Sequence, residues 1–411
     1  MNIILLMFFL VTSCHKEELI TDPPGPTPTP FFEIKWFNRI DSTKEIVNLN
    51  SGQVYKEWYI YSGTIDEPPT IIAFDKKTGK KEWTFVANGI NKYHISQSLI
   101  YQNLYVGSGP SGIIAIDLDI RQIAWEIDFN QWDGGPSAKF STVKDGFLYF
   151  NLDGKFGTGA SDSHLLKINL ITGKHDILFS YFYNGEGETQ ISPVVFYDDI
   201  STGKTIMIYN YSPNGDASPP KSMQYIEARD LISLEVLWRT QVTEYYATNS
   251  LHPPVIYKNI VITGGDWSMY GFDIKTGKQL WKTSIPGYTQ FGIWNKTNHI
   301  IQGDRLYVNT DGFEVLCLNP TTGAIIWNNP EGGPNCTDNM VYYKDMLVFT
   351  SFGYGSVMVL DALTGETLHR ERKLPPAASG DTYNNDAVYD PVTDMFFTAS
   401  FKNAVGFKIN K

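Results

Sequence analysis

Cysteine and clustered positive charge are both scarce in this sequence. The chain has 411 residues but only three Cys, too few to staple a small domain with disulfides. Charged residues make up 19% of the chain, the net charge is −11, and Lys and Arg form no run. Because contact with phosphates requires clustered cations, we do not expect a nucleic-acid partner.

Motifs of metal or nucleotide chemistry are missing too. The seven His residues include no HExxH motif and no close pair with ligand spacing. Residues 107–112 match the GxGxxG pattern, but strand-like sequence at 113–116 follows where a nucleotide-binding motif needs a helix. We therefore predict no catalytic residue, no metal site and no cofactor.

A short apolar segment opens the chain. Residues 3–11 are all apolar, a run too short to span a bilayer but typical of a signal peptide covering residues 1–13. The segment from Val11 to Cys14 resembles the bacterial lipobox. That resemblance implies cleavage before Cys14 and acylation of its thiol, for example by palmitate. The alternative is an ordinary secretory signal followed by an incidental Cys.

Residues 14–30 have the composition of a tether. Lys16, Glu17 and Glu18 resemble the surface-export signal of Bacteroidetes lipoproteins, and residues 22–30 contain five prolines. A proline-rich segment favours an extended chain and cannot supply a sheet ladder. We expect an outer-membrane lipoprotein of a Gram-negative, Bacteroidetes-like bacterium, on the periplasmic or the cell-surface side. It would contact the membrane only through its lipid anchor.

The dominant feature of the remaining chain is a repeat. An Asp or Asn, here called the anchor, recurs every 42 to 61 residues: Asp75, Asp117, Asn169, Asp230, Asp273, Asn319, Asp361 and Asn410. Eight residues after the anchor, five of seven copies place a Trp: Trp83, Trp125, Trp238, Trp281 and Trp327. The anchor can accept hydrogen bonds from turn N–H groups, and Gly four residues on supplies a positive φ in five copies. We interpret the unit as two strands around a tight turn, with the Trp packing between units.

A second hairpin precedes each copy, so that each unit has four strands. Four-stranded units at a period of about 40–50 residues indicate propeller blades. The segment 32–37, which contains Trp36, has no anchor before it, and Asn410 has no Trp strand after it. We predict an all-β, eight-bladed β-propeller of four-stranded antiparallel blades. It would be one monomeric domain over residues 31–411, closed by the N-terminal strand joining the C-terminal blade.

The unit resembles the quinoprotein-type, or PQQ-like, propeller repeat, whose Asp-x-x-Thr-Gly-x-x-x-Trp core appears from Asp75 to Trp83. With lipobox and tether, the chain is similar to the propeller lipoprotein of the outer-membrane barrel assembly machinery. This resemblance implies a membrane-anchored, non-catalytic scaffold that binds a protein partner through its blade loops. The third and fourth copies depart most from the pattern: Ile177 replaces the Trp, Leu234 replaces the Gly, and Arg229 replaces the large apolar residue before the anchor.

Quinoprotein dehydrogenases with the same repeat hold PQQ against a vicinal Cys–Cys ring and a Ca²⁺ site. This chain has no adjacent Cys pair. Cys317 stands two residues before its anchor, where other copies have Ala or Gly, so we expect a small buried core residue. The sequence leaves open whether Cys317 and Cys336 form a disulfide. A divergent quinoprotein enzyme is the less favoured alternative function.

The candidate binding residues are aromatic side chains in loops that propellers usually gather on one face. Aromatic rings give large, rigid contact area, as protein interfaces and sugar platforms use it. The aromatic group is Trp132, Tyr181, Tyr183, Tyr245, Tyr246, Trp267, Trp294, Tyr354 and Tyr383, with Asp133 and Asp266 as polar companions. A protein partner is the first hypothesis, and a surface glycan or small molecule is the second. The alternative without a binding function is that an aromatic-rich β protein carries such residues throughout its structure.

Overall fold

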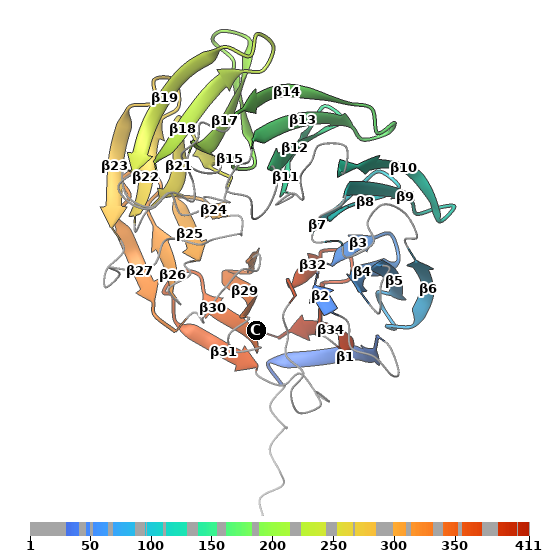
Figure 1. Cartoon of the computed structure of the whole chain (residues 1–411). Helices are drawn as coiled ribbons and strands as arrows, with labels where there is room; N and C mark the ends of the chain where they lie inside the picture. Colours follow the sequence, from blue (N-terminus) through green and yellow to red (C-terminus); the bar gives the residue numbers. More distant parts are fainter. Residues whose placement is uncertain are drawn as a thin grey trace, which may run out of the picture.

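The strands of the chain form eight sheets that follow one another around a ring (Figure 1). A computed structural model describes residues 30–40, 47–49, 52–64, 69–86, 95, 97–109, 112–129, 139–153, 162–182, 189–213, 223–243, 253–265, 268–284, 299–309, 314–331, 340–351, 356–371, 385–400 and 402–410. Within these ranges, no helix is long and apolar enough to cross a membrane. The predicted all-β, eight-bladed propeller is confirmed.

Each blade runs from an innermost to an outermost strand. Blade 1 holds β2 (Val47–Leu49), β3 (Gln53–Tyr55), β4 (Trp58–Thr64), β5 (Pro69–Asp75) and β6 (Lys81–Val86); blade 2 holds β7 (Gln97–Tyr101), β8 (Leu104–Gly109), β9 (Gly112–Asp117) and β10 (Gln122–Asp128); blade 3 holds β11 (Lys139–Lys144), β12 (Phe147–Asp153), β13 (Ser163–Asn169) and β14 (His175–Tyr181); blade 4 holds β15 (Gln190–Ile191), β16 (Val195–Asp199), β17 (Lys204–Ser212), β18 (Gln224–Asp230) and β19 (Val236–Thr243).

The other four blades follow the same order. Blade 5 holds β20 (Val255–Tyr257), β21 (Ile260–Gly265), β22 (Ser268–Asp273) and β23 (Gln279–Ser284); blade 6 holds β24 (Ile300–Gln302), β25 (Arg305–Asn309), β26 (Val315–Leu318) and β27 (Ile325–Asn329); blade 7 holds β28 (Val341–Tyr343), β29 (Met346–Ser351), β30 (Ser356–Asp361) and β31 (Thr367–Glu371); blade 8 holds β32 (Val388–Asp390), β33 (Met395–Ala399), β34 (Asn403–Ile409) and β1 (Phe32–Arg39). In blades 1 and 4 the innermost strand is split in two, and both pieces pair with the second strand.

The N-terminal strand closes the ring, as predicted. Strand β1 pairs antiparallel with β34, with Phe32 opposite Ile409 and Trp36 opposite Gly406. Blade 8 is therefore built from both ends of the chain. This pairing covers the sheet edge that β34 would otherwise expose, and an exposed edge favours aggregation.

Hydrophobic side chains pack between blades rather than in one central core. Among the described residues, buried side chains form eight clusters, and each cluster joins two neighbouring blades, including blade 8 with blade 1. Hydrophobic packing between blades therefore continues around the whole ring. Because burial of apolar surface is the main stabilising contribution in folding, each blade depends on its neighbours.

The repeat Trp residues link successive blades. Indole Nε1 donates to the carbonyl that follows the next blade's anchor in four pairs: Trp36 to Lys76 at 2.9 Å, Trp125 to Leu170 at 2.9 Å, Trp238 to Ile274 at 3.0 Å and Trp327 to Ala362 at 3.2 Å. Within its own blade the indole lies over a small residue. A Cβ on Gly271 would approach the Trp281 ring to 2.3 Å, and fully buried Cys317 occupies the equivalent place opposite Trp327. Cys317 is therefore the core residue that its position predicts.

Two faces of the ring have different connections. The turns between first and second strands adjoin those between third and fourth strands; for example, the Lys76 N–H donates to the Glu57 carbonyl. We call this side the turn face. The opposite side, where second strands lead to third strands and fourth strands lead to the next blade, is the loop face.

Candidate functional site

Ten of the eleven residues proposed for the binding face lie outside the described residues. They are Trp132, Asp133, Tyr183, Tyr245, Tyr246, Asp266, Trp267, Trp294, Tyr354 and Tyr383; Cys14 and Cys336 lie outside them as well. Tyr181, which belongs to the same aromatic group, is described. It ends β14, the outermost strand of blade 3, at the loop face.

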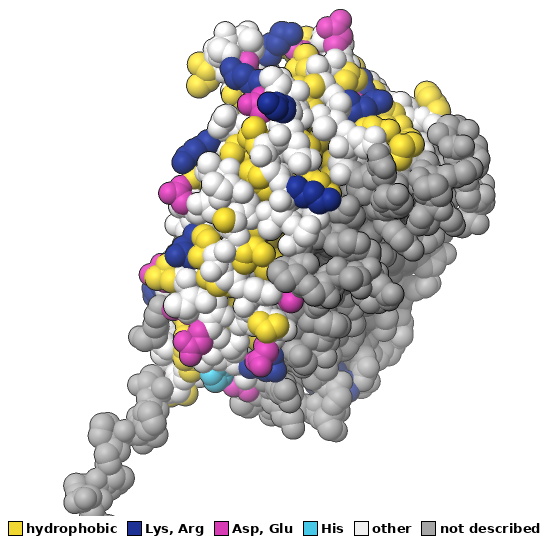
Figure 2. All heavy atoms as spheres, turned by 90° about the vertical axis from the view of Figure 1, so that its left-hand side faces the viewer, with side chains coloured by type: hydrophobic (Ala, Val, Ile, Leu, Met, Phe, Trp, Pro, Cys, Tyr) yellow, Lys and Arg dark blue, Asp and Glu magenta, His cyan; other side chains and the backbone are white. Residues whose placement is uncertain are grey.

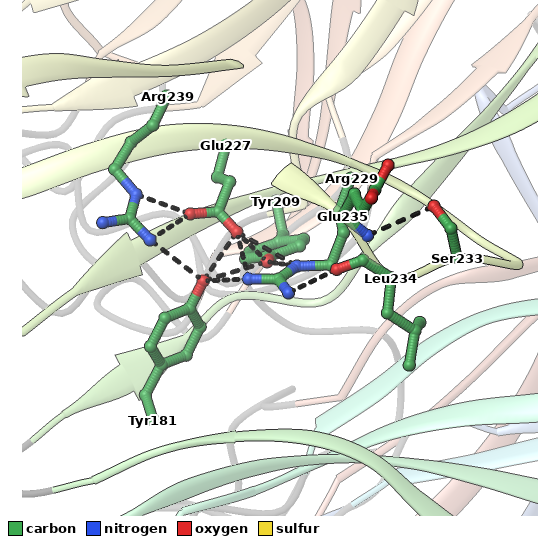
Figure 3. Close-up of polar contacts among 8 residues, drawn as sticks. All are labelled: Tyr181, Tyr209, Glu227, Arg229, Ser233, Leu234, Glu235 and Arg239. Atoms are coloured by element: carbon green, nitrogen blue, oxygen red, sulfur yellow. Dashed lines mark hydrogen bonds and ion pairs between the residues drawn. The ribbon is translucent and has the colours of Figure 1, made fainter. Parts of the chain in front are cut away.

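Tyr181 meets a charged cluster on blade 4 (Figure 3). The Glu227 cluster, as we call it, consists of Tyr181 from β14, Tyr209 from β17, Glu227 and Arg229 from β18, and Arg239 from β19. It therefore spans the boundary between blades 3 and 4. This is the boundary whose blade 3 strand has Ile177 where the repeat places a Trp.

Sheet register explains how these side chains meet. Tyr209 pairs with Glu227, and Glu227 pairs with Arg239, so the three form one row across blade 4. Alternate residues of a strand point to the same face. The next row on that face, toward the loop face, therefore contains Tyr211 and Tyr225, which pair with each other.

Glu227 is the centre of the cluster, and its side chain is fully buried. Its Oε1 accepts hydrogen bonds from the Tyr181 hydroxyl at 2.6 Å, the Tyr209 hydroxyl and Arg229 Nη2 at 2.8 Å. Its Oε2 accepts from Arg239 Nε at 2.5 Å. A carboxylate can be buried only when it is paired and hydrogen-bonded, and both conditions are met.

Arg229 is fixed on several sides. Its guanidinium lies 4.4 Å from the centre of the Phe179 ring, and its Nη1 donates to the Leu234 carbonyl at 2.7 Å. Leu234 occupies the turn position that is Gly in most blades and has a φ of 62°, which costs a non-glycine residue about 1–3 kcal/mol. Arg229 and Leu234, the two positions at which blade 4 departs from the repeat, are thus hydrogen-bonded to each other.

The accessible part of the site is aromatic. The Tyr181 and Tyr211 rings stack at 3.8 Å between centroids, and Tyr225 follows Tyr211 at 6.2 Å. The Arg239 guanidinium lies 5.2 Å from the Tyr211 ring, the Arg239 side chain is 40% exposed, and the three tyrosines are half-buried. We call Tyr181, Tyr211, Tyr225 and Arg239 the Tyr–Arg patch.

The electrostatics of the cluster keep Glu227 ionised. Burial alone would raise the pKa of Glu227, but hydrogen bonds from both tyrosines and the two arginine charges lower it below the ordinary 4.5. Burial and the nearby Glu227 charge raise the pKa of Tyr181, and burial raises the pKa of Tyr211 to about 12. At neutral pH, two guanidinium groups thus face one carboxylate, and the cluster is net positive.

Sequence reasoning noted Arg229 as an exception but missed Glu227. A signal for Glu227 exists: it stands three residues before its anchor, where the other copies have Ile72, Ile114, Leu166, Tyr270, Leu316, Met358 and Phe407. Two charged residues therefore replace apolar ones on the same strand face. The pairing of that strand with Tyr209 and Arg239, and the approach of Tyr181, follow only from the structure.

A second feature lies at the ring axis. A cavity of about 510 Å³ is lined by the innermost strands of blades 3 to 6, within the range of small-molecule sites. Its polar side chains include Lys144, whose Nζ lies 3.0 Å from Asp198, and His299, whose pKa burial lowers to about 4. Among the described residues, no group of three or more His, Cys, Asp or Glu could hold a metal ion.

Comparison with known proteins agrees with the architecture. A family model described as outer membrane protein assembly factor BamB matches residues 227–330 and 271–400. Similar solved structures include BamB from Moraxella catarrhalis, with 12% identity, a TM-score of 0.58, and coverage of 92% of this chain and 97% of that chain. No curated protein sequence matches the chain.

Two redox enzymes share the fold as well. A europium-containing methanol dehydrogenase has 11% identity and a TM-score of 0.65, with 92% and 93% of the two chains covered. The quinohemoprotein alcohol dehydrogenase from Comamonas testosteroni has 11% identity and a TM-score of 0.66, with 92% and 76% covered. At such identities the likeness shows the fold alone. The chain is thus an eight-bladed propeller of the PQQ-like type, and over residues 227–400 it is similar to the outer membrane protein assembly factor BamB family.

Proposed function

We propose that this chain is a membrane-anchored, non-catalytic scaffold that binds a protein partner through the loop face of blades 3 and 4. The observation that carries the proposal is the Glu227 cluster with its adjoining Tyr–Arg patch. The anchor would be the acylated Cys14, and residues 14–30 would be the tether. The similarity to an outer membrane protein assembly factor supports an outer-membrane location and a protein partner.

The cluster is difficult to explain by stability alone. Hydrophobic residues of similar volume in place of a buried ion pair are often neutral or stabilising, and the other blades have apolar residues at the Glu227 position. A carboxylate that accepts hydrogen bonds from both Arg239 and Tyr181 has another use, since it holds the patch rigid. Rigid Tyr and Arg side chains are enriched among interface residues that dominate binding energy.

A small-molecule or glycan ligand is the second candidate function. The axial cavity of about 510 Å³ and the stacked tyrosines favour it, since sugar rings and other flat ligands bind on aromatic faces. The two candidates differ in where substitutions act. A protein partner depends on the patch at blades 3 and 4, whereas a ligand in the axial cavity does not.

Replacement of Arg239 by Gln is expected to weaken partner binding by at least about tenfold, because interface hot spots contribute 2 kcal/mol or more. The blade 7 equivalent, Arg370, also stands nine residues after its anchor and provides the matched control Arg370→Gln. Co-purification of the partner from solubilised membranes measures the effect, and thermal melting shows that each variant is folded. If Arg239→Gln is unstable, Tyr225→Ala replaces it. Equal recovery with the wild type and both patch variants would contradict the proposal.

A further inference from the structure

Exposed apolar side chains gather at the tips of turns on one face. Of the seven most exposed large apolar residues that the structure describes, six are turn residues, and the seventh is Phe182. The six are Ile120 (64% exposed), Ile171 (51%), Ile200 (96%), Ile232 (89%), Leu363 (49%) and Val392 (81%). An Ile that is almost wholly exposed forgoes about 1.5–3 kcal/mol of burial, so such a distribution calls for a cause.

All six residues belong to the turn face. Ile200 and Val392 lie between the first and second strands of blades 4 and 8, and the others lie between third and fourth strands. In blade 4 a hydrogen bond from the Leu231 N–H to the Thr205 carbonyl, 2.9 Å long, joins the turn of Ile232 to that of Ile200. The apolar tips therefore project from one side of the ring.

The turns themselves do not require apolar residues. Ile171, Ile232 and Leu363 stand two residues after their anchors, and the equivalent positions in the other blades hold Lys77, Asp119, Lys275 and Thr321. Apolar and polar copies form the same turn, in which the anchor side chain accepts hydrogen bonds from the N–H groups two and three residues further on. The fold thus accepts either a polar or an apolar side chain two residues after the anchor.

The chain enters the propeller from the same side. The N–H of Asn410 donates to the Phe31 carbonyl at 2.9 Å, and its side-chain amide donates to the Pro30 carbonyl at 3.0 Å. Asn410 is the anchor of blade 8, and anchors lie at the turn face. A tether that runs from Cys14 to residue 30 would therefore join the membrane to this face of the ring.

Charges beside the tips are largely neutralised within the protein. Next to Ile200, Asp199 pairs with Lys275 at 3.4 Å, and next to Ile232, Asp230 pairs with Lys204 at 3.1 Å. Charges of this kind neither attract nor repel a lipid surface strongly. Contact with the lipid would therefore depend on apolar burial and little on salt.

We propose that the turn face docks on the lipid bilayer, with the apolar turn tips of blades 2 to 4 inserted at the boundary between headgroups and acyl chains. The inference rests on the proposed membrane anchoring and adds an orientation to it. With the turn face on the lipid, the loop face and its Tyr–Arg patch face away from the bilayer. Each tip contributes weakly, but Ile120, Ile171, Ile200 and Ile232 lie on the same face and would insert together, and a lipid anchor would strengthen their contact with the membrane further.

Vesicle flotation tests the docking without the anchor. A mature chain with Cys14→Ser cannot be acylated there, and it is mixed with phosphatidylcholine vesicles that contain no protein. We expect a measurable floating fraction that high salt leaves unchanged. Adding Ile200→Asp and Ile232→Asp is expected to lower that fraction by at least about fivefold, because charged tips resist burial in the interface.

Matched controls come from the rim of the ring (Figure 2), where hydrophobic side chains lie among charges of both signs. Val86 ends β6 and is 43% exposed, and Phe182 directly follows β14 and is 70% exposed, so Val86→Asp with Phe182→Asp introduces the same charges at the loop-face ends of outermost strands, away from the turn face. This control should float like the parent chain. Absence of floating protein, loss at high salt, or equal loss in both double variants would overturn the docking. Partner co-purification in detergent, which lacks a bilayer, reports on the proposed function separately.

Discussion

Replacing Glu227 by Ala is expected to lower the free energy of unfolding by about 3–5 kcal/mol, because removal of one partner leaves buried charge uncompensated. Arg229, which is only 13% exposed, would lose its carboxylate partner, and the Tyr181 and Tyr209 hydroxyls would lose their acceptor. Urea unfolding at neutral pH measures the change. The exposed neighbour Glu235 provides the control Glu235→Ala, for which a change within about 0.5 kcal/mol is expected.

The same carboxylate makes stability depend on pH in a defined direction. The folded-state pKa of Glu227 lies below 4.5, so its contribution is fully present above that pH and is lost as pH falls through the lowered folded-state pKa. The wild type should therefore lose stability more steeply than Glu227→Ala as pH falls below about 4.5. Parallel curves for the two proteins would show that Glu227 does not interact with the arginines.

A double substitution separates structure from function at this site. Glu227→Leu with Arg229→Leu restores the apolar residues that the repeat has at both positions, and hydrophobic replacement of buried ion pairs is often neutral or stabilising. We expect stability near that of the wild type, together with weakened partner binding. If binding also stays unchanged, the cluster is only a structural link between blades 3 and 4.

Replacing Trp36 by Ala is expected to cost about 3–5 kcal/mol, the range for truncating a large buried aromatic residue. Trp36 is 6% exposed, stacks near Phe74 and Phe397, and donates to the Lys76 carbonyl. A buried ion pair between Lys76 and Asp390, 3.1 Å long, crosses the same boundary of blades 8 and 1. The change would therefore weaken the place where the ring closes.

Hydrogen exchange and urea unfolding together measure the Trp36 effect. In Trp36→Ala, the amides of β1 should exchange faster than those of the other outermost strands, and the unfolding midpoint should fall. Lys35→Ala changes a neighbouring exposed side chain on the same strand and should leave both unchanged. An unchanged midpoint in Trp36→Ala would mean that β1 covers the edge of blade 8 without closing the ring.

The blade architecture was predictable because it depends on residues that are close in sequence. The anchor, the Gly and the Trp act within one turn or on the adjacent blade, so a single repeat unit carries the rule, and the unmatched Trp36 pointed to ring closure. The split of the innermost strands in blades 1 and 4 was not expected, since nothing in the repeat marks it.

The candidate site was predictable only in part. Tyr181 was singled out among loop aromatics, but its partners come from three strands of the next blade, and only register brings Tyr209, Glu227 and Arg239 into one row. Glu227 resembles an ordinary exposed strand residue until it is compared with its repeat equivalents. The exposed apolar turn residues were not predicted either, because an apolar residue in a sequence is usually assigned to a core.

Site-specific photo-crosslinking in cells is the most direct test of whether the Tyr–Arg patch binds a protein partner. A photoreactive residue is placed at Tyr225 in the patch or at Leu280 on the rim of blade 5. We expect one discrete protein adduct from position 225, reduced by Arg239→Gln, and no such adduct from position 280. No adduct from position 225, or the same adducts from both positions, would contradict partner binding at the patch.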